Sequence, residues 1–176
     1  MNNKDVIKIL DKLISCKSVT PYDDQCQEYI ANFLKGLGFK IEFKKYDDVT
    51  NLIARYGTEK PVLAYVGHTD VVPTGDINKW ETDPFKLTDK NSKLYGRGTS
   101  DMKGGIACMM HAIQEHLSDN KNFIGSIIVI LTSDEEGPAI NGIKKLVESG
   151  DLTPVSYTHL RAHETKANLV CRLLLE

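Results

Sequence analysis

Two short apolar runs constrain the fold of this chain most strongly. Residues 61–66 (PVLAYV) and 125–131 (GSIIVIL) are apolar almost throughout. Runs of this length without alternation are typical of buried strands in a sheet. Between them, residues 102–117 are rich in Ala and Met and predict a helix. Strands that alternate with helices indicate an α/β domain in which helices cover a sheet.

The remaining segments fit the same class. Apolar residues at helical spacing predict helices over residues 4–15 and 24–37, with Gly38 ending the second as a C-cap. We also expect strands at 39–43 and 52–56 and a helix at 140–149. Residues 71–89 are predicted to form a long surface loop that carries its own aromatic residues. Long loops of this kind are often functional.

Composition excludes several classes of protein. The chain has 176 residues, of which 41% are hydrophobic and 26% are charged, with a net charge of −2. This suits one domain and gives no support for a nucleic-acid partner. No apolar stretch approaches the roughly 20 residues that span a membrane, and the first residues lack a signal-peptide pattern, so we expect a cytoplasmic protein. The four cysteines have no CxxC spacing, which favours buried free thiols over a disulfide framework.

Each predicted central strand ends in residues that can carry chemistry. His68 and Asp70 follow the first run, and an extended chain places both side chains on one side. One imidazole nitrogen can bind a metal while a carboxylate holds the other N–H. A histidine at a strand end beside a solvated aspartate is the plain alternative. Three acids, Asp134, Glu135 and Glu136, follow the second run, where they need either solvent or nearby cations.

A glycine-rich segment, GRGTSDMKGG at residues 96–105, lies between these two motifs. Its Asp101 is predicted at the start of the third helix, where an aspartate is often a simple N-cap. A carboxylate can also bridge two cations, and glycines allow the backbone to approach closely. Each motif alone leaves the plain structural alternative open.

The order of the motifs is more specific. The patterns GHTDVVPTGD, WxxDPF, LYGRGTSDMKGG and TSDEEG, spread over residues 67–137, resemble the zinc-dependent aminoacylase and peptidase family. The resemblance extends from the N-terminus to about Leu152. It is nearest to members that cleave an N-succinyl amide, releasing succinate and a diamino acid in bacterial lysine and cell-wall biosynthesis. A sibling deacylase or dipeptidase, such as acetylornithine deacetylase, is the main alternative.

The resemblance implies a role for each matching residue. His68 and Glu136 would each bind one zinc ion, Asp101 would bridge the two ions, and cobalt could substitute for zinc. Glu135 would be the general acid/base, acting on a water whose pKa zinc lowers. Asp70 would orient His68. The family also tends to have a cis peptide bond after the bridging aspartate, here Asp101–Met102. The partner would be a small N-acyl amino acid substrate.

The resemblance also implies that parts of the enzyme are missing. The fold expected is the N-terminal part of a zinc-peptidase-like catalytic domain, an incomplete mixed sheet flanked by helices. Further metal ligands and a lid or dimerisation domain would lie beyond Leu152, and the full-length protein would be a homodimer. We therefore expect this chain to be inactive and to aggregate through an unpaired sheet edge. A non-catalytic metal-binding module and a structural domain with solvated acidic loops are the alternatives from other classes.

The last residues have a different character. Residues 155–165 (VSYTHLRAHET) and 168–176 (NLVCRLLLE) match the translation of a transposase-based sequencing adapter. We therefore predict that residues 1–154 belong to the catalytic domain and that residues 155–176 are an adapter-derived artefact. A natural C-terminal helix is the alternative. Under the artefact interpretation, His159, His163 and Glu164 have no functional weight, although their types suit metal binding.

Overall fold

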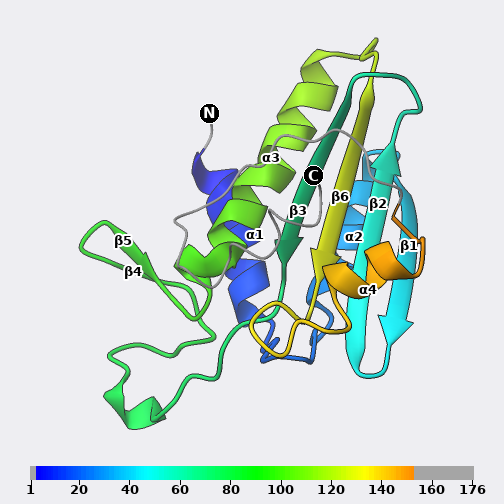
Figure 1. Ribbon diagram of the computed structural model, residues 1–176. Helices are drawn as coiled ribbons and strands as arrows, with labels where there is room; N and C mark the ends of the chain where they lie inside the picture. Colours follow the sequence, from blue (N-terminus) through cyan, green and yellow to red (C-terminus); the bar gives the residue numbers. More distant parts are fainter. Residues whose placement is uncertain (1–2, 153–176) are drawn as a thin grey trace.

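The computed structural model describes residues 3–152. Its centre is a four-stranded sheet in the order β1-β2-β6-β3 (Figure 1). The strands are β1 (Lys40–Tyr46), β2 (Val49–Tyr56), β3 (Val62–His68) and β6 (Ser126–Thr132). Antiparallel pairs join β1 to β2 and β2 to β6, whereas β3 runs parallel to β6. The sheet is therefore mixed, as predicted.

Helices cover both faces of this sheet. One face packs against α1 (Asn3–Ser15), α2 (Cys26–Gly36) and α3 (Gly104–Asp119), and this side holds the larger core cluster. The other face carries α4 (Ile143–Glu148), whose Leu146 packs with Ile53 and Ile130. All seven residues of β6 are buried, as predicted for a strand between two helical layers. In residues 3–152, no helix combines the length and the apolar character that crossing a bilayer would require.

The prediction that residues 61–66 form a buried strand is only partly correct. The strand exists, but Leu63 is 46% exposed and several neighbours are only half-buried. The reason is that β3 lies at one end of the sheet order and pairs with β6 alone among the described strands. One edge of β3 is thus unpaired within residues 3–152.

Local signals in the sequence account for several element ends. Gly38 has φ +94°, and the Gly38 and Phe39 amides donate to the carbonyls of Lys35 and Leu34. This is a Schellman motif, which closes α2 as the C-cap prediction required. Residues 143–148 of the predicted 140–149 helix are helical, but α4 begins only at Ile143 because residues 134–142 form a loop.

The predicted loop at 71–89 contains structure of its own. It includes the short 3₁₀ helix η1 (Ile77–Lys79), and it leads into a hairpin of β4 (Thr88–Lys90) and β5 (Lys93–Tyr95). Asn91 and Ser92 both have positive φ, as a two-residue type I′ turn requires. The hairpin projects beside α1 and away from the sheet (Figure 1).

Of the cysteines in the described residues, Cys16 and Cys26 are buried free thiols, as predicted, whereas Cys108 is free but exposed. Cys171 lies outside the described residues, as do His159, His163, Glu164 and the rest of the predicted artefact.

Candidate metal centre

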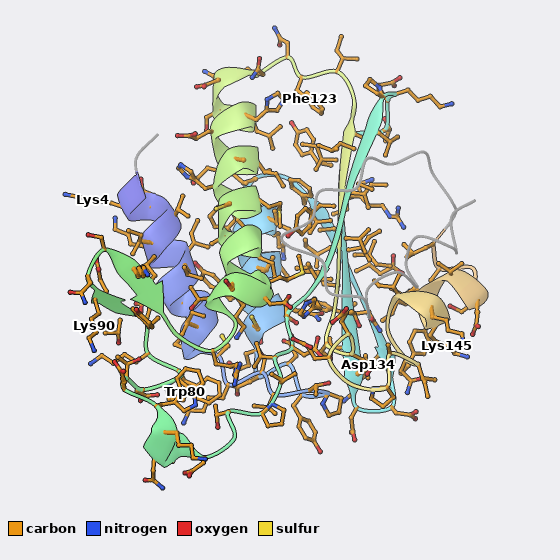
Figure 2. The ribbon with its side chains drawn as sticks, turned by 60° about the vertical axis from the view of Figure 1, so that its left-hand side comes forward. Lys4, Trp80, Lys90, Phe123, Asp134 and Lys145 are labelled. Carbon is orange, nitrogen blue, oxygen red and sulfur yellow. The ribbon has the colours of Figure 1, made fainter. Side chains whose placement is uncertain are left out.

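The parallel pairing of β3 with β6 brings the two predicted motifs together. His68 is the last residue of β3 and pairs in register with Thr132, the last residue of β6. The chain therefore leaves both strands at the same edge of the sheet, so the acids that follow β6 lie beside His68. Figure 2 shows Asp134 at this end of β6, and the structure places Glu135 and Glu136 next to it.

His68 is held on both of its ring nitrogens. Its Nδ1 lies 2.9 Å from the backbone carbonyl oxygen of Asp70, and its Nε2 lies 3.2 Å from Oδ1 of Asp101. Because a carbonyl oxygen only accepts, Nδ1 carries the hydrogen in that contact. Neutral His68 would thus have a free lone pair on Nε2, the nitrogen that faces the acids. This is the orientation that a metal-binding histidine needs.

The acids around His68 raise the pKa of its side chain. The side chain is almost fully buried, and burial alone would lower its pKa. Contacts with Asp101, Asp70 and Glu135 outweigh burial and raise the pKa of His68 to about 10. The Glu135 carboxylate lies 3.7 Å from Nε2. The site therefore attracts a positive charge at this nitrogen.

Asp101 stands opposite His68 on a separate segment. It lies in η2 (Thr99–Lys103), a distorted turn ahead of α3, with a non-helical φ of −131° and ψ of 101°. The Asp101–Met102 peptide bond is cis, which confirms the expectation from the family resemblance. The N-cap position of α3 belongs to Lys103, so the N-cap interpretation of Asp101 is wrong. Its side chain is 63% exposed and turned toward His68.

Asp70 has a more extensive role than the sequence predicted. Its side chain is fully buried, and its carboxylate accepts hydrogen bonds from the backbone N–H of Glu136 at 3.0 Å and of Glu135 at 3.2 Å. The carboxylate also lies 3.5 Å from His68 Nδ1, farther than the Asp70 carbonyl. Asp70 therefore ties the two glutamates to the end of β3, and its backbone rather than its carboxylate makes the short contact with His68.

The donor atoms converge closely enough for a cation. One ligand atom each from His68, Glu135 and Glu136 lies within 4.8 Å of the others. Burial raises the pKa of Glu136, and the carboxylates of Asp101, Glu135 and Asp70 act in the same direction, against His68. Such crowding of acids is relieved by a bound cation. The alternative of solvated loops required these groups to be scattered, and the distances contradict it.

Comparisons with known proteins give the family. The sequence model of Peptidase family M20/M25/M40 matches residues 64–171. The chain is 49% identical over 144 residues to a succinyl-diaminopimelate desuccinylase of Thioalkalivibrio sulfidiphilus, an alignment that covers 82% of this chain and 38% of that protein. It is 47% identical over 149 residues to the desuccinylase of Acinetobacter baumannii strain ACICU, covering 85% and 39%. The chain belongs to the M20/M25/M40 peptidase family.

Solved structures agree with the M20 fold. An M20 family metallo-carboxypeptidase from Sulfolobus solfataricus has a TM-score of 0.78 at 24% identity, over 88% of this chain and 37% of that one. Human carnosine dipeptidase 1 has a TM-score of 0.73 at 22% identity, over 83% and 35%. This M20 chain spans less than two fifths of the length of the curated relatives named here. Because the family match runs past residue 154, the proposed boundary there stays a prediction.

Sequence reasoning missed a buried polar network beneath this M20 site. Thr69, between the two predicted residues, donates from its hydroxyl to Asp23 at 2.7 Å and accepts from the Gln27 amide at 3.1 Å. Burial raises the pKa of Asp23. Asp134 was grouped with the solvated acids, yet it is buried and accepts from the backbone N–H of Ala139 and Asn141. No spacing in the sequence distinguished these residues from ordinary surface polar groups.

Proposed function

We propose that this chain is the N-terminal, metal-binding part of an amide hydrolase that cleaves N-succinyl-diaminopimelate into succinate and diaminopimelate. The observation that carries the hydrolase proposal is the convergence of His68, Glu135 and Glu136 donor atoms within 4.8 Å. The substrate follows from the two desuccinylases at 49% and 47% identity. Diaminopimelate serves lysine and cell-wall biosynthesis.

The residues present fit zinc. Imidazole nitrogen and carboxylate oxygen are ligand types that zinc accepts, and cobalt accepts the same set. We propose two zinc ions, with His68 and Glu136 each holding one and Asp101 contributing a carboxylate to both. When bound, such ions polarise the substrate carbonyl and lower the pKa of a water molecule. Further ligands and the acyl-binding residues would come from the part of the relatives that this chain does not span.

The chain's own residues would orient the reacting groups and move protons. Glu135 lies beside His68 Nε2, with its carboxylate partly exposed, so it can take a proton from water and return it to the leaving amine. Asp70 holds the Glu135 and Glu136 backbones through their amides. The carbonyl of Asp70 also fixes the ring of His68, leaving Nε2 directed at the acids. A homodimer and a cytoplasmic location stay predictions for the full-length protein.

The test is a glutamine substitution of the proposed acid/base in the full-length protein. Glu135→Gln should abolish hydrolysis of N-succinyl-diaminopimelate while the zinc content stays unchanged, because the amide cannot accept the proton. Glu148→Gln, at a half-exposed acid on α4, is the matched control and should keep full turnover. Retained turnover in Glu135→Gln would refute the acid/base role of Glu135, whereas a full-length wild-type protein that binds zinc without any turnover would favour a non-catalytic metal-binding module.

The same preparation separates the desuccinylase from its siblings. Initial rates with N-succinyl-diaminopimelate and N-acetylornithine are compared at equal concentration. Faster hydrolysis of the acetyl compound would replace the proposed substrate with that of acetylornithine deacetylase, while leaving the hydrolase proposal intact.

A further inference from the structure

A lysine two residues after the proposed bridging aspartate is completely buried. Lys103 has 0% exposure, and its Nζ donates hydrogen bonds to the backbone carbonyls of Leu13 and Cys16, each at 2.8 Å. These carbonyls lie at the C-terminal end of α1, where the helix leaves acceptors unpaired. Buried lysines are rare unless they are paired, so this arrangement needs a specific reason.

The segment that carries Lys103 is packed on two sides. Its backbone N–H donates to the Gly98 carbonyl at 2.9 Å, closing the turn around Asp101. A Cβ on Gly96 would lie 2.8 Å from a methyl of Ile14, so the segment rests directly on α1. α1 and α3 lie side by side on one face of the sheet, and this segment leads into the N-terminal end of α3 (Figure 1).

Met102, which lies between Asp101 and Lys103, reaches the strand that ends in His68. The Met102 sulfur accepts a hydrogen bond from the His68 backbone N–H at 3.2 Å. A Cβ on Gly67 would lie within 3 Å of the Met102 side chain, so only glycine leaves room for this contact. Met102 therefore fixes the segment to β3, whereas Lys103 fixes it to α1.

We propose that Lys103 is a positioning residue that sets the Asp101 carboxylate against His68 by anchoring its segment to the end of α1. Asp101 itself is largely exposed, so its own burial does not hold it in place. The anchors at Met102 and Lys103 therefore contribute to its position, together with its contact with His68. This inference rests on the proposed metal site, but it concerns a residue that touches neither metal nor substrate.

The experiment uses the 176-residue chain fused to a soluble carrier protein, which keeps it in solution. Lys103→Met removes both hydrogen bonds with little change in volume, and Lys103→Gln keeps a neutral donor on a shorter side chain. Zinc affinity is measured by competition with a chelating dye, and the visible spectrum of the cobalt-loaded chain reports ligand geometry. Leu146→Ala on α4 is the control for a general loss of core packing, because Leu146 is buried on the opposite face.

We expect both Lys103 variants to bind zinc about 10–100-fold more weakly and to show an altered cobalt spectrum, as when the residues that support metal ligands are lost. Leu146→Ala should retain the wild-type spectrum and affinity. Wild-type affinity in a folded Lys103 variant overturns the positioning role while leaving the metal site in place. If circular dichroism shows that neither variant folds, Lys103 has only a general folding role and the inference is also wrong. A wild-type chain that binds no zinc overturns zinc binding by the ligands of this chain, and the inference with it.

Discussion

The double contact of Asp70 with the Glu135 and Glu136 amides gives a quantitative prediction. In Asp70→Asn, the amide oxygen can take the place of Oδ2, which accepts from both backbone N–H groups at 3.2 and 3.0 Å. Two bonds to a carboxylate become bonds to a neutral amide, and the weaker contact of the Glu135 N–H with Oδ1 at 3.3 Å is lost because the asparagine NH2 does not accept. In Asp70→Ala, both N–H groups lose their acceptor.

The magnitude follows from the number of bonds. Hydrogen bonds to charged groups contribute about 1.5–3 kcal/mol each, and neutral ones about 0.5–1.5 kcal/mol. Asp70→Asn should therefore make opening of this loop easier by about 2–3 kcal/mol for the pair, or roughly 30–150-fold. Asp70→Ala should lose about 3–6 kcal/mol and exceed roughly 100-fold.

Hydrogen exchange at these two amides measures this opening directly. The chain fused to its carrier protein is incubated in D2O and digested, and mass spectrometry follows deuterium uptake in peptides that separate residues 135–136 from 139–141. Asp134→Asn is a matched control, because Asp134 is a neighbouring buried aspartate that accepts from the Ala139 and Asn141 amides instead. The Asp70 variants should accelerate exchange at the Glu135 and Glu136 amides, and Asp134→Asn should accelerate it at the Ala139 and Asn141 amides. Unchanged exchange at residues 135–136 in Asp70→Ala would refute the role assigned to Asp70.

Three other predictions follow from the site and the sheet edge. A bound cation must displace the proton on His68, whose pKa is about 10. Zinc affinity of the wild-type chain, measured by chelator competition with His68→Gln as the control, should therefore rise about tenfold per pH unit from pH 6 to 8. A flat profile for the wild-type chain would contradict this prediction. Without its carrier the chain should aggregate through the β3 edge, and light scattering should show that Leu63→Lys slows this aggregation. Ile77→Lys is the control, since Ile77 is an exposed aliphatic residue on η1, and it should slow aggregation less. Equal effects of the two variants, or a cooperative thermal transition of a wild-type monomer, would contradict this prediction. The purified chain should not hydrolyse N-succinyl-diaminopimelate, since it spans only 38% of the relative's length, and measurable zinc-dependent turnover would refute this.

The fold was predictable where one local signal decides the structure. The apolar run at 125–131 became a buried strand, and Gly38 closed α2, because burial and backbone freedom act at single positions. The exposure of Leu63 was not predictable, since it depends on which strand lies next to β3. The β4–β5 hairpin was missed because its turn uses Asn91 and Ser92, without the glycine that usually marks a type I′ turn.

The site was predictable in its residue types but not in its contacts. His68, Asp101, Glu135 and Glu136 do converge, and the motifs at the strand ends indicated this. The partners of Asp70 were not foreseen, because backbone N–H groups leave no trace in a sequence. Lys103 was overlooked for a related reason, since its acceptors are the carbonyls of Leu13 and Cys16.

Strand order explains why motifs that are far apart in the chain meet. His68 and Thr132 are register partners only because β3 joins β6 in parallel; an antiparallel pairing would place the end of β3 beside the start of β6. The crossover from β3 to β6 runs through η2 and α3, so the same connection that makes the pairing parallel also carries Asp101 back to the strand ends. His68, Asp101 and the two glutamates thus belong to one β-α-β unit. The proposed metal site is therefore a consequence of this topology, and loss of the Lys103 anchor should affect the site before it affects the sheet.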